Sequence, residues 1–332
     1  MAEGPIAIIG AGLAGAACAR ALREAGRDAV LFDKGRGAGG RLSTRQAETP
    51  SGTACIDHGA QFLTARGEAF TALMEEARAA GSAAPWEGRL VSIDRAGNVE
   101  PLREETRWTG TPGMNAIVKT ALSGFEVRFG ARATKLKGGP GRWRVVLEEG
   151  GEEGPFAAIA VTIPPEQMID LFARSNADFA EQIAEAKEAV LGPCQAVMLQ
   201  CDPGFDPGFD AAKLYGGGVT WMARTLSKPG RNGAESWVLH ASTNWSRVHL
   251  EDSPEAVIRA LTEEVHVRFG MPLPGWAAAH RWRYALSEKS PGTPFALDET
   301  GTVGCGGDWR LGGRAELAWD SGLALGEVLA RA

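Results

Sequence analysis

Three glycines close to the start of the chain, Gly10, Gly12 and Gly15, have the G-x-G-x-x-G spacing of a loop that binds a dinucleotide. The first glycine allows a tight turn, the second lets the backbone approach a pyrophosphate, and the third lets a helix pack closely on a strand. The following helix would offer free N–H groups, here those of Leu13 and Ala14, and a partial positive charge that stabilises phosphates. The spacing therefore predicts phosphate binding; the alternative is a glycine-rich turn that binds nothing.

The residues around these glycines have the pattern of a β-α-β unit. Residues 6–9 are a short apolar run typical of a buried parallel strand, and residues 14–25 form an alanine-rich pattern that predicts a helix. A second apolar strand is expected at 28–32 and leads into Asp33. Asp33 would accept hydrogen bonds from a ribose and disfavour a 2′-phosphate, so this acid and the adjacent Lys34 join the expected nucleotide site.

A second glycine loop follows the acid at once. The stretch DKGRGAGGRLSTR, residues 33–45, carries Gly40 and Arg41, and an arginine can pair with two phosphate oxygens together. A domain that binds only NAD would continue from its acid into an ordinary loop and helix. We therefore expect this second loop to approach the same pyrophosphate, although a solvated basic loop would have a similar composition.

The glycine loop, the acid and a G-G-R-x-x-T/S element with Arg41, Ser43 and Thr44 together resemble the FAD-binding signature of the flavin amine oxidase and glutathione-reductase-like superfamily. This resemblance implies FAD, bound non-covalently, as the resident cofactor. It also implies that backbone near Ala133 lies at the adenine.

Two further segments acquire roles from the same resemblance. The end of the chain would complete the site, with residues 301–330 forming a strand, a Gly-Gly-Asp turn and a closing helix that begins near residues 313–315. Free N–H groups at that helix start would stabilise negative charge on the flavin pyrimidine. Gln61 and Phe62 would lie on a strand that passes the flavin ring. The expected contacts at the end of the chain are Gly307, Asp308, Arg314 and Ala315.

Residues 56–66, 242–257 and 280–286, with the closing segment, resemble more closely the renalase group, especially its bacterial members. That resemblance covers essentially the whole chain. It implies an FAD oxidase that oxidises dihydro-NAD(P) isomers by hydride transfer to the flavin, releases NAD(P)+ and reduces O2 to H2O2. The alternatives are a flavin-containing amine oxidase, or another FAD oxidoreductase acting on a small organic substrate, and a non-catalytic dinucleotide-binding protein.

Hydride transfer from a dihydropyridine needs no acid or base, because the ring nitrogen supplies the electrons. Accordingly, no catalytic triad or metal cluster is evident in the sequence. Arg314 stands where amine oxidases carry a cage aromatic, and its charge would suit a phosphate-bearing substrate better than a cationic amine. Alternatively, Arg314 is a solvated cap residue, His58 bonds backbone in a turn, and the aromatic residues are core. The catalytic candidates are His58, Gln61 and Arg314; the candidates for the substrate pocket are His240, Trp282 and Tyr284.

The expected fold is α/β, or α+β overall. It combines a Rossmann-like FAD-binding domain of the glutathione-reductase/p-hydroxybenzoate-hydroxylase type with an inserted substrate domain, built on an antiparallel sheet plus helices. Residues 1–62, 106–165 and 286–332 are assigned to the FAD-binding domain, and residues 63–105 and 166–285 to the substrate domain.

Composition limits the partners. The chain has 332 residues, a formal net charge of -6, and five scattered cysteines with no C-x-x-C spacing. These features do not favour a nucleic-acid partner, a disulfide framework or a zinc site. No signal peptide and no apolar run of membrane-spanning length is evident, so a cytoplasmic enzyme is expected, with the oligomeric state left open. Its partners would be a dihydronicotinamide dinucleotide and O2.

Overall fold

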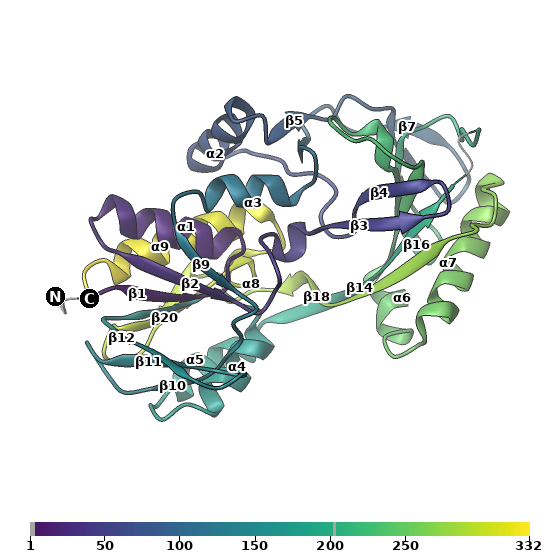
Figure 1. Cartoon of the computed structure of the whole chain (residues 1–332). Helices are drawn as coiled ribbons and strands as arrows, with labels where there is room; N and C mark the ends of the chain where they lie inside the picture. Colours follow the sequence, from purple (N-terminus) through teal and green to yellow (C-terminus); the bar gives the residue numbers. More distant parts are fainter. Residues whose placement is uncertain (1–3, 202–203) are drawn as a thin grey trace.

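The computed structural model describes residues 4–201 and 204–332; residues 1–3, part of the first segment expected in the FAD-binding domain, lie outside the described residues. Two large sheets dominate the structure (Figure 1). The sheet that contains β1 lies on the left of the view, and the sheet that contains β16 lies on the right. Two long strands, β14 (Val190–Gln200) and β18 (Ala277–Lys289), run from the middle of the molecule into the second sheet.

The first sheet has six strands and contains the expected β-α-β unit. The prediction is confirmed by β1 (Ile6–Ile9), α1 (Leu13–Glu24) and β2 (Ala29–Asp33). Their boundaries differ from the predicted ones by no more than one residue. All neighbouring strands are parallel except β19 and β20, which are antiparallel. The order is β19 (Phe295–Leu297), β20 (Val303–Gly306), β13 (Ile159–Val161), β1, β2 and β9 (Glu126–Phe129).

Alternation along β1 separates two apolar cores, because successive side chains point to opposite faces of a sheet. Ile6 and Ile8 belong to one cluster, and Ala7 and Ile9 belong to the other. The first face is covered by α1, α2 (Glu68–Ala79), α3 (Asn115–Ala121) and α9 (Ala315–Leu329). The second face is covered by β10 (Ala133–Lys137), β11 (Trp143–Leu147), β12 (Glu152–Phe156), α4 (Pro165–Ala173) and α5 (Ala180–Ala186).

The first and last helices touch through glycines. A Cβ atom added to Gly322 would lie 2.1 Å from the carbonyl oxygen of Ala14, and one added to Gly326 would lie 2.6 Å from that of Cys18. α1 and α9 therefore pack backbone against backbone, which joins the dinucleotide loop to the closing segment.

The second sheet has seven strands, and all neighbours are antiparallel except β15 and β6. Val197 and Leu199 point to the face covered by α7 (Pro254–Phe269), while Met198 and Val238 point to the face that packs on β4. The order is β18, β14, β17 (Ser236–Ala241), β16 (Val219–Arg224), β15 (Ala211–Leu214), β6 (Leu90–Ile93) and β7 (Val99–Pro101).

Smaller elements join the two sheets. The hairpin of β3 (Thr44–Thr49) and β4 (Gly52–Asp57) extends from the first sheet towards the second (Figure 1). The remaining short elements are η1 (Gly40–Leu42), β5 (Ala83–Pro85), β8 (Trp108–Gly110), η2 (Thr225–Ser227), α6 (Thr243–Val248) and α8 (Asp308–Leu311).

The expected domain division remains a prediction, and four elements do not follow it. α2, α4 and α5 come from segments assigned to the substrate domain, yet they pack on the first sheet because their apolar faces complete its two cores. β18 passes continuously through the boundary at 285/286. Within the described ranges, no helix is long and apolar enough to span a membrane.

Replacing Gly322 with Val should force α1 and α9 apart, because the new side chain would collide with backbone rather than with a movable side chain. We expect the free energy of unfolding to fall by about 2 kcal/mol, measured by urea unfolding of the FAD-loaded protein. Gly275→Ala is the control, since Gly275 has open space around its Cβ position. Equal unfolding midpoints for the two variants would contradict the close helix contact.

Candidate active site

The first glycine loop has the geometry that phosphate binding requires. Gly10 has a φ of +108°, which favours glycine, and a Cβ on Gly15 would lie 1.9 Å from the carbonyl oxygen of Gly10. A Cβ on Gly12 would meet nothing within 4 Å, so this glycine faces open space. No side chain caps the N-terminus of α1, where Leu13 and Ala14 begin the helix, and its N–H groups can donate hydrogen bonds to a ligand.

Asp33 holds the tip of this loop in place. Its carboxylate accepts hydrogen bonds from the backbone N–H groups of Ala11 at 2.8 Å and Gly35 at 2.6 Å. The N–H of Ala131 donates to the carbonyl oxygen of Asp33, which brings β10, and thus Ala133, to the same edge. Lys34 lies beside the loop, where its ammonium donates to the Gln167 side chain.

The second glycine loop lies against the first. A Cβ on Gly40 would lie 3.9 Å from the Cα of Gly12. Arg41, expected to pair with phosphate, forms a two-point ion pair with Asp308, in which one N–H···O distance is 2.7 Å, and also donates to the carbonyl oxygen of Ala285. Arg41 and Asp308 therefore neutralise each other, and any ligand group would share them as a pair. Gly307, just before Asp308, donates its N–H to the Ser321 hydroxyl at 2.7 Å.

The N-terminus of α9 is occupied by an ion pair. Arg314 pairs with Glu316 in the first turn of the helix, and Glu316 also accepts hydrogen bonds from the N–H groups of Arg66 and Gly67. Arg314 is thus paired, whereas the sequence argument treated it as a free cation. The backbone of Ala315 begins the helix with no side-chain cap.

The residues around the two glycine loops fit FAD. Gly12 faces open space next to an uncapped helix start, as a pyrophosphate requires. Glu166 has a buried carboxylate oxygen without a hydrogen-bond partner. Burial raises the pKa of Glu166, while the charge on nearby Arg41 opposes that rise. An orphaned carboxylate beside the Arg41–Asp308 pair suits the hydroxyl groups of a ribityl chain. The sequence argument did not single out Glu166.

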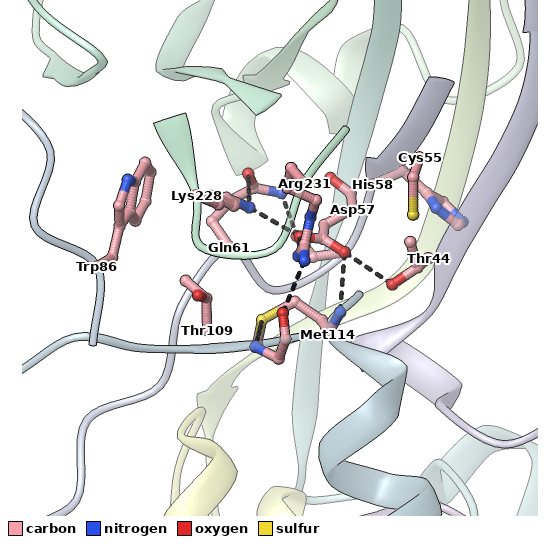
Figure 2. A network of polar contacts seen from close by, with 12 residues as sticks. Thr44, Cys55, Asp57, His58, Gln61, Trp86, Thr109, Met114, Lys228 and Arg231 are labelled. Carbon is pink, nitrogen blue, oxygen red and sulfur yellow. Dashed lines mark hydrogen bonds and ion pairs between the residues drawn. The ribbon is translucent and has the colours of Figure 1, made fainter. Parts of the chain in front are cut away.

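A buried charge network joins the β3–β4 hairpin to the second sheet (Figure 2). One oxygen of Asp57 accepts from Lys228 Nζ at 2.9 Å and from Arg231 Nη2 at 2.5 Å, and all three side chains are essentially inaccessible to water. The other oxygen accepts from the hydroxyl of Thr44 at 2.7 Å and from the N–H of Met114 at 3.0 Å.

The network has two cations for one carboxylate. Burial alone would raise the pKa of Asp57, but Lys228 and Arg231 hold that pKa at about 2. Burial lowers the pKa of Lys228, an effect that the charge of Asp57 opposes. Lys228 also donates to the Oε1 of Gln61 at 3.0 Å, and Gln61 donates to the carbonyl oxygens of Asp57 and Gly59.

Four rings converge next to this network. The ring of His58 stacks on Trp282 with centroids 5.3 Å apart and lies 4.7 Å from the ring of His280. Trp282 Nε1 donates to the carbonyl oxygen of His58 at 2.9 Å, and His240 Nε2 lies 3.2 Å from that oxygen. Ala196 is the cross-strand partner of both His240 and His280, so only a methyl group lies between these histidines on the shared face.

His58, His240, His280 and Trp282 form a ring cluster. Its three imidazoles are neutral near pH 7. Burial lowers the pKa of both His58 and His240 to about 4, and burial with the charge of Arg45 lowers that of His280. The cluster can thus offer flat faces and single hydrogen bonds without adding charge.

The structure brings together His58, His240 and Trp282, but places Tyr284 elsewhere. Tyr284 packs against the apolar cluster of α4 and α5, and it makes no ring contact with the others among the described residues. Gln61 and Phe62 lie in an extended segment outside any strand, which corrects the expected strand. The segment forms only an isolated β-bridge, at Leu63. The turn after β4 directs its backbone towards the buried network of Asp57.

Sequence reasoning missed Asp57, Lys228 and Arg231 as parts of one site. Asp57 directly precedes His58, so its segment was recognised. Lys228 and Arg231 lie more than 170 residues further along the chain, and no spacing connects them to Asp57.

Two adjoining glycine loops and the partly buried Arg41–Asp308 pair form the candidate FAD site of an oxidoreductase. Residues 96–320 match the flavin containing amine oxidoreductase family, and residues 8–77 match the NAD(P)-binding Rossmann-like domain. Since the first match covers more than half of the chain, this protein belongs to the family of flavin-containing amine oxidoreductases.

Solved structures with a similar fold share little sequence. A provisional protoporphyrinogen oxidase from Exiguobacterium is 12% identical with a TM-score of 0.75, over 100% of this chain and 99% of that one. Cyclohexylamine oxidase from Brevibacterium oxydans is 15% identical with a TM-score of 0.73, over 99% of each chain. Putrescine oxidase bound to putrescine is 14% identical with a TM-score of 0.70, over 98% of each chain.

Asp57→Asn should lower the free energy of unfolding by about 3 kcal/mol at pH 7, because it leaves two buried cations without a counter-charge. Since the folded-state pKa of Asp57 is below the unfolded value, its contribution is present above about pH 4 and is lost as the pH falls towards 2. The difference between wild type and variant should therefore shrink over that range, measured by urea unfolding.

Asp206→Asn is the control for this prediction, because Asp206 forms an exposed pair with Arg89 that solvent screens, so this variant should keep nearly the wild-type stability. If both variants lost equally little stability, the buried network would not hold the two sheets together.

Proposed function

We propose that this protein is an FAD oxidase of the renalase type, which oxidises dihydro-NAD(P) isomers that are reduced at the wrong ring carbon. The observation that supports this most is the ring cluster: a tryptophan and three neutral imidazoles meet around Ala196 beside the expected flavin site. A dihydronicotinamide is a flat, uncharged ring, and such a surface can hold it by stacking.

The two glycine loops would hold FAD, which would supply a hydride acceptor and the means to reduce O2, so that dihydro-NAD(P), O2 and a proton would become NAD(P)+ and H2O2. The residues of this chain have the task of orienting the donor ring and excluding water. Trp282 and His58 would hold the ring face, while His240 and His280 would offer hydrogen bonds to the carboxamide. No side chain needs to remove a proton, because the donor ring nitrogen is already substituted.

Several other predictions belong to this proposal. FAD would be bound without a covalent tether, because Cys305 packs in an apolar cluster with Ile9 and Phe32, and burial raises the pKa of its thiol to about 11. The fold would be of the glutathione-reductase/p-hydroxybenzoate-hydroxylase type, with the domain boundaries given above. A cytoplasmic location would agree with the five scattered cysteines, which show no C-x-x-C spacing.

The second candidate function is amine oxidation. Family membership favours it, and two of the similar structures are named as oxidases of cyclohexylamine and putrescine. The pairing of Arg314 with Glu316 removes one argument against an amine. The excess positive charge of Lys228 and Arg231 over Asp57 still disfavours a cationic amine near Gln61.

The deciding experiment is anaerobic reduction of the FAD-loaded protein by borohydride-reduced NAD+, which contains the isomers and ordinary NADH. We expect rapid loss of the oxidised-flavin absorbance, and recovery of colour with formation of H2O2 when air is admitted. Pure NADH and a panel of primary amines are the controls. Bleaching by an amine, and not by the isomer mixture, would make the protein an amine oxidase instead.

Trp282→Leu should raise the KM for the isomers about tenfold, because a stacking surface is lost, while Trp282→Phe should retain most of the affinity. Steady-state oxygen consumption measures both. Trp245→Leu is the matched control, because Trp245 also stacks on a histidine, His249, but packs on the opposite face of the second sheet. Unchanged kinetics in Trp282→Leu would remove the ring cluster from the substrate site.

A further inference from the structure

A pocket of about 460 Å³ lies beside the segment that leads away from Gln61. Two stretches form it, and they are tied together by a pair of backbone hydrogen bonds between Leu63 and Trp108, each 2.8 Å long. The lining residues are Thr64, Ala65, Arg66, Arg103, Glu105 and Thr106.

The pocket is positively charged although the whole chain has a net charge of -6. Arg103 forms no ion pair within the described part of the chain. Arg66 is 61% exposed and lies 3.5 Å from Glu105, whose carboxylate is also bound by Arg107 at 3.2 Å. Because Glu105 is shared between two guanidinium groups, the positive charges of Arg66 and Arg103 are only partly balanced.

The pocket adjoins the proposed flavin and substrate site from two directions. The N–H groups of Arg66 and Gly67 are held by Glu316, which places this edge at the first turn of α9. On the other side, the guanidinium of Arg107 lies over the ring of Phe62, 5.4 Å from its centroid, and Phe62 follows Gln61 directly.

We infer that this pocket binds the phosphate groups of a nicotinamide dinucleotide while its ring lies in the ring cluster. This inference rests on the proposed function and names a part of the substrate that it recognises. A dinucleotide has charged phosphates that cannot enter a neutral ring-lined site without a large desolvation cost, so they need a separate polar site at its mouth. Arginine is suited to that role, since its planar fork binds two phosphate oxygens at once.

The test is calorimetric titration of the FAD-loaded protein with ADP-ribose, which carries the pyrophosphate but no nicotinamide and cannot be oxidised. Bound FAD excludes ADP-ribose from the cofactor site. We expect ADP-ribose to bind. Arg66→Gln and Arg103→Gln should each raise its Kd about tenfold, as loss of a charged hydrogen bond does. Arg259→Gln is the control, because Arg259 is exposed on α7, which covers the opposite face of the second sheet.

Inorganic pyrophosphate and AMP distinguish the origin of binding. Weaker binding of both than of ADP-ribose supports a dinucleotide site, whereas pyrophosphate binding as tightly as ADP-ribose would indicate a site for a free anion and overturn the inference. Equal affinity of ADP-ribose for wild type, Arg66→Gln and Arg103→Gln would also overturn it.

Flavin reduction by the isomer mixture separates this inference from the proposed function. If the mixture reduces the flavin with the same KM in wild type and Arg103→Gln, the inference fails and the function stands. If ADP-ribose binds in the arginine-dependent way but the mixture does not reduce the flavin, the phosphate site stands and the proposed reaction fails.

Discussion

The candidate active site depends on one buried interaction, the ion cluster of Asp57 with Lys228 and Arg231. Asp57 ends the hairpin that extends from the first sheet, and the two cations come from the loop after η2 on the second sheet. Taking three charges out of water is costly, and only full pairing and hydrogen bonding compensate it. The cluster therefore determines how the two sheets meet, and with them the position of His58 and Gln61.

A second constraint joins the two ends of the chain. Arg41 and Asp308 are 267 residues apart in sequence and form a two-point pair, while α1 and α9 touch through Gly322. Together these contacts hold the dinucleotide loop, the second glycine loop and the closing segment against one another. Arg41, which suggested phosphate binding in the sequence, thus has Asp308 as a structural partner. This pairing orients Arg41 next to the expected FAD site.

Charge is divided between the parts of the site. The ring cluster is neutral, because burial holds the pKa of His58 and His240 at about 4. Charged groups lie outside it, in the Asp57 network and in the pocket of Arg66 and Arg103. A site of this kind suits a substrate with an uncharged reacting ring and distant phosphates, since each part meets an environment of matching polarity.

The sequence by itself determined the local elements: β1, α1 and β2 follow from an apolar run, a glycine spacing and an alanine-rich helix pattern within 33 residues. It also indicated the segments of His58, His240 and Trp282, through motifs that span a few residues each. Only the tertiary structure decided that Tyr284 packs away from them, that Glu316 binds the backbone N–H of Arg66, and that Lys228 reaches Asp57. The physical reason is that these contacts join strands and loops far apart in the chain, where neither residue spacing nor propensity carries information about which side chains meet.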